Sequence, residues 1–209
     1  MNKKIIFILA VSLFLLTACN NGVDKLGTKK VADENNKVAS FFNTYFDDGK
    51  YLLKFKSWSD SGENMTCIMG VDGDNYYLEY ETLEGKQVLF VKDNKSYGIL
   101  DDLKSYVVED IDESSKMQDD FNSKDIIGKT YEVCEETIGE KVYQCEKFVS
   151  ETGEENHYCF EENNLKYIVT KAGDAKVYLE ILSVSDEIPH AYFEIPEGYE
   201  KIEYWFCFY

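Results

Sequence analysis

Arginine is absent from this 209-residue sequence, and all 22 basic residues are lysine. The guanidinium fork that grips phosphate or guanine through two hydrogen bonds is therefore missing. Forty acidic residues outnumber the lysines and give a formal net charge of −18 at pH 7. A chain this acidic repels a phosphate backbone and anionic lipid headgroups. The composition thus argues against nucleic-acid binding and against electrostatic attraction to a membrane.

Proline and long apolar runs are also scarce. The two prolines, Pro189 and Pro196, lie near the C-terminal end of the sequence, where they suit sheet edges or strand ends. The apolar run Ile5–Leu16 has 12 residues including one serine, fewer than the roughly 20 that a helix needs to cross a bilayer. No membrane-spanning helix is expected.

The first 18 residues have the layout of a secretory signal peptide: a lysine pair, an apolar run and small residues before a cysteine. The stretch Leu16-Thr17-Ala18-Cys19 resembles the bacterial lipobox. That resemblance implies cleavage before Cys19, diacylglycerol on its thiol and an acyl chain such as palmitate on the new amino terminus. The alternative is a plain secretory signal with an incidental cysteine.

Lipid on Cys19 predicts an exported protein held on the outer face of the cell membrane, because each buried CH₂ contributes about 0.8 kcal/mol. Residues 19–34 are polar, contain no aromatic residue and are expected to form a flexible tether. Residues 35–209 are then long enough for one domain. Their apolar and aromatic content, 44% and 15% over the whole chain, predicts a packed globule.

The stretch 33–51, where the tether meets this domain, predicts a helix. Val38, Phe41, Phe42, Tyr45 and Phe46 form one apolar stripe at helical spacing. We expect Asp33 or Asn35 as the cap and Gly49 as the end, although the aromatic richness leaves a strand as the alternative.

From Lys50 onward, short aromatic and β-branched runs alternate with turn clusters that contain Gly, Asp or Asn, as antiparallel hairpins do. The spacing leaves no room for crossover helices, so a parallel βαβ fold is excluded. Residues 101–129 interrupt the pattern with an acidic segment that we read as a strand near 106–108 and a helical or irregular insert. We expect a mainly β (α+β) fold of roughly ten strands in a single, strongly curved antiparallel sheet, a half-barrel. A closed barrel is the alternative.

This order of segments resembles the LolA-like lipoprotein-carrier superfamily, especially uncharacterised bacterial surface lipoproteins with a lipobox signal peptide. The resemblance is carried by "VDGDNYYLEY" (71–80), "NNLKYIV" (163–169) and "IPHAYFEIPEGYEKI" (188–202). It implies a half-barrel with helices across its open side and acyl chains bound between them. It assigns no ligand-binding residue, and the tail 203–209 has no counterpart in it.

Five cysteines remain beside Cys19, an odd number for an exported chain: Cys67, Cys134, Cys145, Cys159 and Cys207. A two-residue turn at Gly139-Glu140 would place Cys134 opposite Cys145, and a turn centred on Thr152 would place Cys145 opposite Cys159. Opposed residues have Cβ atoms about 4.5–5.5 Å apart, near disulfide range. The expected alternatives are a disulfide from Cys145 to either neighbour, or unpaired thiols.

A zinc site with His157 is disfavoured, because Cys134 and Cys159 would lie about 9.5 Å apart, two strand spacings. "DGDN" at 72–75 reads as a hairpin turn rather than a calcium loop. Neither the other histidine, His190, nor the many carboxylates form a catalytic signature. We therefore expect no enzyme, cofactor or metal.

The abundant aromatic residues, 16 Tyr and 13 Phe, suit a cleft for an apolar ligand as well as an ordinary core. The function expected from the sequence is a membrane-anchored, non-enzymatic lipoprotein that binds a lipid or acyl chain in the concave face of a half-barrel. The alternative is a protein-interaction or sensory module of the cell envelope, with a protein as its partner.

Overall fold

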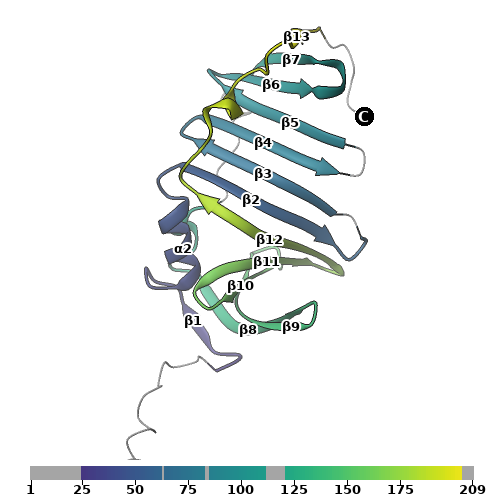
Figure 1. Ribbon diagram of the computed structural model, residues 1–209. Coiled ribbons are helices and arrows are strands. Elements are labelled where there is room, and N and C mark those ends of the chain that lie inside the picture. The colour runs from purple at the N-terminus through teal and green to yellow at the C-terminus, as the bar shows by residue number, and fades with distance from the viewer. Residues whose placement is uncertain (1–24, 63, 83–84, 112–120, 204–209) are drawn as a thin grey trace, which may run out of the picture.

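One open sheet dominates the molecule (Figure 1). The computed structural model describes residues 25–62, 64–82, 85–111 and 121–203. In them, thirteen strands pair in the order β1-β8-β9-β10-β11-β12-β2-β3-β4-β5-β6-β7-β13, and the two edges do not meet. The mainly β prediction is confirmed and the closed-barrel alternative is wrong. The prediction of ten strands is too low, because the short edge strands β1 and β13 carry no alternating pattern.

The strands are β1 (Lys29–Val31), β2 (Lys50–Ser59), β3 (Asn64–Asp72), β4 (Asn75–Thr82), β5 (Gly85–Lys92), β6 (Lys95–Leu100), β7 (Ser105–Asp110), β8 (Thr130–Ile138), β9 (Lys141–Val149), β10 (Glu155–Glu161), β11 (Asn164–Ala172), β12 (Ala175–Ser185) and β13 (Glu200–Lys201). The helical elements are α2 (Lys37–Tyr45) and the 3₁₀ turns η1 (Asp101–Leu103), η3 (Ser123–Asp125) and η4 (His190–Phe193).

All neighbouring strands are antiparallel except β7 and β13. The segment after β12 runs past β2–β6 to the far edge of the sheet, where β13 pairs with β7 in parallel (Figure 1). Residues 186–199 connect β12 to this distant edge. The prediction of a purely antiparallel sheet is wrong at this one edge.

Helix α2 forms where the apolar stripe predicts it. Its N-cap is Asn36, whose side chain accepts a hydrogen bond from the Ala39 N–H at 3.0 Å. The predicted caps Asp33 and Asn35 are wrong, because Asp33 instead receives the Asn35 N–H in a turn before the helix. The helix also ends before Gly49, which adopts a positive φ of 65° in the turn into β2.

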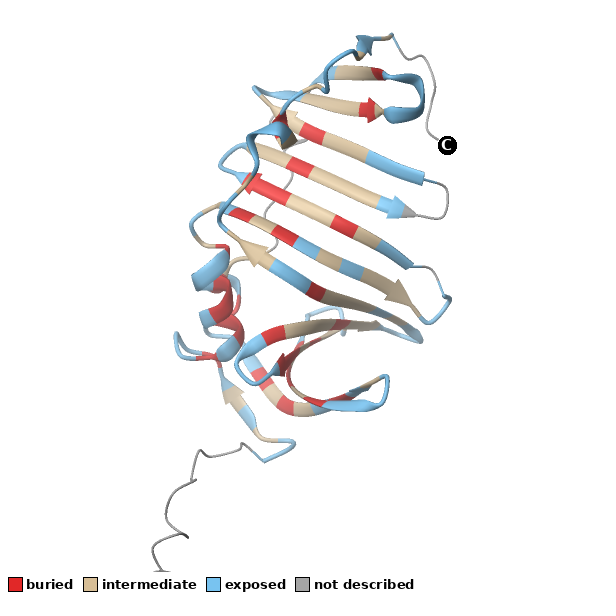
Figure 2. Cartoon of the chain, in the orientation of Figure 1, coloured by how far each residue is buried: buried red, intermediate tan, exposed pale blue. Residues whose placement is uncertain are grey.

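The helix and its neighbouring strands hold the largest buried cluster. Figure 2 shows buried positions on α2 and on the strands close to it. The cluster includes Phe42 and Phe46 of α2, Tyr51 and Leu53 of β2, and Phe160 of β10. Residues 112–120 of the predicted mid-chain insert lie outside the described residues. On either side of them, the predicted strand is present as β7 and η3 packs against α2.

A second cluster lies on the opposite face of β4–β6. Tyr77, Phe90 and Ile99 are buried there beneath Phe193 of η4. Tyr192 stacks on Tyr77 with ring centroids 4.4 Å apart. The segment 186–199 is therefore a strap that covers this face of the sheet.

The sheet curls sharply through β8–β12 (Figure 1). On a flat sheet, β8 and β12 would lie about 19 Å apart, four strand spacings. Yet Glu136 of β8 accepts a hydrogen bond from the ammonium of Lys176 on β12 at 3.1 Å. Two side chains cannot bridge a gap of that size, so the face that carries Glu136 is the concave side of the curl.

Candidate functional site

The predicted lipid attachment site lies outside the described residues. This holds for Cys19, for the lipobox residues Leu16, Thr17 and Ala18, and for Cys207 in the C-terminal tail. The membrane anchor therefore stays a prediction. In the described part of the chain, no helix is both long and apolar enough to span a bilayer.

Both predicted cysteine registers are present. Cys134 lies opposite Cys145 across β8 and β9, and Cys145 lies opposite Cys159 across β9 and β10. Of the two alternative bridges, the structure contains Cys145–Cys159. Cys134 keeps a free thiol, and so does Cys67, which is buried on β3. The three aligned cysteines share the concave side of the curl with Tyr143 and Val169.

A charged cluster lies beside these cysteines. Glu136 is 6% exposed and accepts hydrogen bonds from the ammonium groups of Lys171 and Lys176. Its carboxylate also lies 2.7 Å from Nδ1 of His157, which is 4% exposed. Nε2 of that imidazole lies 3.0 Å from Glu155. Four strands thus contribute to one ionic network, which lies on the inside of the curl.

Burial and charge shift the acidity of these groups. Burial alone would raise the pKa of Glu136, but the hydrogen bonds from Lys171 and Lys176 hold it below its ordinary value. Burial lowers the pKa of His157, against the opposing effect of its contact with Glu155. Burial and the nearby Glu136 charge raise the pKa of the Cys134 thiol to about 11. At neutral pH this cysteine is therefore a thiol rather than a reactive thiolate.

The other motifs considered in the sequence are the "DGDN" turn and His190. Asp72 and Asn75 end and begin two paired strands, and the residues between them form a tight turn with Gly73 at a φ of +60°. Among the described residues, no three His, Cys, Asp or Glu side chains are grouped to hold a metal ion. His190 is exposed, with Glu194 3.6 Å away, and lies far along the chain from His157.

The feature best suited to an apolar ligand is a straight row of side chains across β3–β7, called here the apolar row. Met69, Leu78, Leu89, Gly98 and Val107 are opposed in register, one on each strand. The row continues under α2, because Met69 is also paired with Leu53, which is 1% exposed. It therefore begins in the main core and runs outward on the same face of the sheet.

The outer part of the apolar row is not packed under another described element. Leu78, Leu89 and Val107 are partly exposed and belong to none of the three buried clusters. Val91, next to Leu89 on the same face, is also partly exposed. The strap packs on the reverse side of these strands, so among the described residues this face is the less covered of the two.

Turn positions in the sequence contain the signal for this row. A turn at Gly73-Asp74 pairs residues whose numbers add to 147, which opposes Met69 and Leu78. A turn at Asp93-Asn94 gives sums of 187, which opposes Leu89 and Gly98. Both registers are present in the structure. These two turns determine the register of the row, as the turn at Gly139-Glu140 determines that of Cys134 and Cys145.

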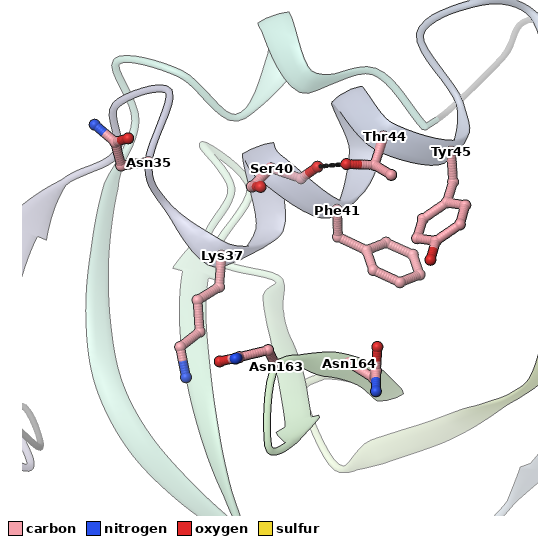
Figure 3. A pocket seen from close by; sticks show the side chains of 8 residues that line it. All are labelled: Asn35, Lys37, Ser40, Phe41, Thr44, Tyr45, Asn163 and Asn164. Atoms are coloured by element: carbon pink, nitrogen blue, oxygen red, sulfur yellow. Dashed lines mark hydrogen bonds between the residues drawn. The ribbon is translucent and has the colours of Figure 1, made fainter. Parts of the chain in front are cut away.

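Two surface cavities lie beside α2 rather than on the row. One, of about 290 Å³, lies between the outer side of the helix and the β10–β11 turn. Figure 3 shows its wall, which is formed by Asn35, Lys37, Ser40, Phe41, Thr44, Tyr45, Asn163 and Asn164. The other, of about 480 Å³, is lined mainly by polar residues between α2 and the end of β12. Neither cavity has the predominantly apolar wall expected for an acyl-chain site.

No protein-family model matches this chain, and no curated protein matches it. Among solved structures, an uncharacterized conserved protein from Thermus thermophilus is similar, with a TM-score of 0.47 and 10% sequence identity. The match covers 81% of this chain and 99% of the Thermus chain. A likeness of this degree does not indicate a shared function.

Proposed function

We propose that this protein is a lipid-anchored, non-enzymatic protein of the cell envelope that binds an acyl chain along the apolar row. The observation that supports the proposal is the register of Met69, Leu78, Leu89 and Val107 on one face of the sheet, where no other described element packs over the last three. Gly98 stands between the last two, and the side chain of Val107 lies close over it. We also propose that the fold is the half-barrel of the LolA-like superfamily, with α2 as the helix on its face.

The binding mechanism is partition of apolar surface out of water. Removing apolar area from water contributes about 25 cal/mol per Å². The row crosses five strands and is therefore about 19 Å long, comparable to an extended long acyl chain. One end lies beside the aromatic core under α2, where the ligand gains a second apolar contact surface.

The proposed location differs from the one expected from the sequence. The concave side of the curl carries the Glu136 network and the Cys145–Cys159 disulfide. Displacing buried ion pairs by a hydrocarbon chain would leave charges without partners, which costs several kcal/mol. The ligand therefore belongs on the opposite face, which carries α2 and the apolar row.

The Cys19 anchor would keep the binding face close to its source of lipid. The mature chain is strongly acidic, so it would not adhere to anionic headgroups through charge. The tether at residues 19–34 would then allow the face to approach the bilayer and withdraw from it. In this scheme, membrane attachment and ligand binding are separate functions of separate segments.

Lipid extraction and native mass spectrometry of the purified protein test the proposal. We expect a co-purifying lipid in the wild-type protein and at least a tenfold lower yield in L89D, which places a charge in the row. The matched control is L182D, because Leu182 is 44% exposed on β12 and lies away from the row. Absence of lipid from the wild-type protein, or equal yields in both variants, would contradict acyl-chain binding.

A second candidate is a protein-interaction module, supported by the partly exposed side chains of Leu78, Leu89 and Val107 on one face of the sheet. Contiguous apolar side chains on a sheet face also suit a flat protein partner. In that case, no lipid co-purifies, and L89D abolishes cross-linking to an envelope protein while L182D does not. The same pair of variants therefore separates the two candidates.

A further inference from the structure

Three neighbouring strands each place one cysteine side by side on the concave side of the curl. Cys145 is the central one, directly opposed to Cys134 on β8 and to Cys159 on β10. It is bonded to Cys159, whereas Cys134 is free. The sulfur of Cys145 therefore has its disulfide partner on one neighbouring strand and the free thiol of Cys134 on the other.

Thiol–disulfide exchange proceeds by attack of a thiolate on one sulfur of a disulfide. The incoming and leaving sulfurs take opposite sides of the attacked atom. Cys134 and Cys159 flank Cys145 in this way, because β8 and β10 lie on opposite sides of β9. We propose that Cys134, Cys145 and Cys159 form an intramolecular disulfide relay, in which the bridge moves between Cys145–Cys159 and Cys134–Cys145.

The exchange balances without an external oxidant or reductant. Cys134 loses its proton, and its sulfur forms a bond with the sulfur of Cys145. The Cys145–Cys159 bond breaks, and Cys159 leaves as a thiolate that takes up a proton. One disulfide and one thiol are present before and after the step, so no sulfur is oxidised or reduced overall.

His157 is placed to accept the proton of the attacking thiol. Its Nδ1 lies 3.6 Å from the Cys134 sulfur. Its lowered pKa keeps the imidazole neutral at neutral pH, as a proton acceptor must be. In the tautomer whose Nε2–H donates to Glu155 at 3.0 Å, the lone pair of Nδ1 faces both the thiol and the Glu136 carboxylate 2.7 Å away, so a proton taken up by Nδ1 is held there by Glu136.

The charged groups that act on Cys134 from the surrounding strands oppose one another. Glu132 and Glu136 disfavour the thiolate, and Lys147 and Lys171 favour it. Burial adds to the effect of the two acids, so the thiolate is the minor form at neutral pH. The exchange rate should therefore follow the small thiolate fraction of Cys134.

The relay gives a buried bridge a route to solvent. Cys145 is 1% exposed and Cys159 is 0% exposed, so an external thiol cannot reach their bond directly. Cys134 is only partly buried on β8. Moving the bridge to Cys134–Cys145 presents a sulfur that a small dithiol can attack. Reduction of the folded protein should therefore depend on Cys134.

The first test maps disulfides in the wild-type protein. The purified protein is incubated at pH 7 or pH 9, quenched in acid, alkylated and analysed by peptide mass spectrometry. The relay predicts a fraction of molecules with a Cys134–Cys145 bridge and an alkylated Cys159. A pKa of about 11 for Cys134 predicts an approach to equilibrium about 100-fold faster at pH 9 than at pH 7. Detection of the Cys145–Cys159 bridge alone at both pH values would overturn the relay.

The second test compares the rates at which dithiothreitol reduces the folded protein at pH 7. C134S is expected to lose the Cys145–Cys159 bridge at least tenfold more slowly than the wild-type protein. C67S is the matched control, because Cys67 is the other free thiol of the described chain and lies on β3. A folding defect would speed reduction, so slower reduction cannot arise from instability. Equal rates in C134S and the wild-type protein would overturn the relay.

Discussion

The side chain of Asn36 donates a hydrogen bond of 2.8 Å to the carboxylate of Glu146, 110 residues later in the chain. Asn36 is the N-cap of α2 and Glu146 lies on β9. The same carboxylate receives the backbone N–H groups of Lys37 and Val38. A buried acid on the sheet thus satisfies the first donors of the helix, which have no partner within it, and its charge suits the positive end of the helix dipole.

Replacing Asn36 with alanine should lower the free energy of unfolding by more than the loss of an ordinary N-cap side chain does. The loss of an N-cap side chain costs about 1 kcal/mol, and a buried carboxylate left without that donor adds roughly 1–3 kcal/mol. We therefore expect N36A to lower the free energy of unfolding by roughly 2–4 kcal/mol, measured by urea denaturation. N35A, at the exposed neighbouring position, should change it by less than about 0.5 kcal/mol. A similar small effect in both variants would contradict the tertiary cap.

Two buried glutamates should respond to pH with opposite signs. The pKa of Glu136 is lowered, so its stabilising effect is present at neutral pH and is lost as pH falls through the lowered value. E136Q should therefore be less stable than the wild-type protein at neutral pH, and this difference in the free energy of unfolding should become smaller in strong acid. Burial raises the pKa of Glu146 above its ordinary 4.5, so the folded wild-type protein gains stability as pH falls toward 4.5.

The E146Q variant cannot take up this proton. Its free energy of unfolding should therefore fall further below that of the wild-type protein as pH decreases toward 4.5. Urea denaturation of both variants and the wild-type protein between pH 3 and pH 7.5 makes the comparison. Curves for E136Q and E146Q that run parallel to the wild-type curve would show that neither carboxylate titrates as described.

The contact between Gly98 and Val107 in the apolar row can be tested by a double variant. A methyl group on Gly98 would lie 3.0 Å from Cγ2 of Val107, closer than a relaxed contact. In V107A that obstruction is removed, and G98A should then stabilise the fold by about 0.4–1 kcal/mol through its effect on the unfolded chain. In the wild-type background we expect no gain. Equal effects in both backgrounds would show that the two positions are not opposed.

Phe193 should hold the strap on the sheet. It is 7% exposed and packs with Tyr77, Phe90 and Ile99. F193A should lower stability by roughly 3 kcal/mol. In hydrogen exchange, the amide of Ile202, which donates to the carbonyl of Tyr106 at 3.0 Å, should lose protection before the amides of α2. Simultaneous loss across the chain would instead show that the strap and α2 unfold as one unit.

Short-range patterns predicted the local elements of this fold. The turn at Gly139-Glu140 was enough to align Cys134 with Cys145, because a two-residue hairpin determines the register of its strands. Helix α2 followed from one apolar stripe. Its cap did not, because the choice of Asn36 over Asn35 depends on Glu146, which the fold brings in from a distant strand.

Long-range pairings were beyond the sequence patterns. β12 pairs with β2, so chain segments about 120 residues apart become neighbours. The curl that follows brings Glu136 to Lys176, and neither residue has a sequence pattern that marks it as buried. For this reason, the concave face was expected to be apolar, whereas in the structure it carries the ionic network. The apolar surface lies on the other face of the sheet.

Photo-cross-linking measures most directly whether an acyl chain occupies the apolar row. A fatty acid with a diazirine near its methyl end is incubated with the purified protein, irradiated, and its sites of attachment are mapped by peptide mass spectrometry. The account predicts labels on β4–β7, at or next to Leu78, Leu89 and Val107, and their loss in L89D but not in L182D. Labels confined to the strap or to the inside of the curl would contradict it, as would labelling that L89D leaves unchanged.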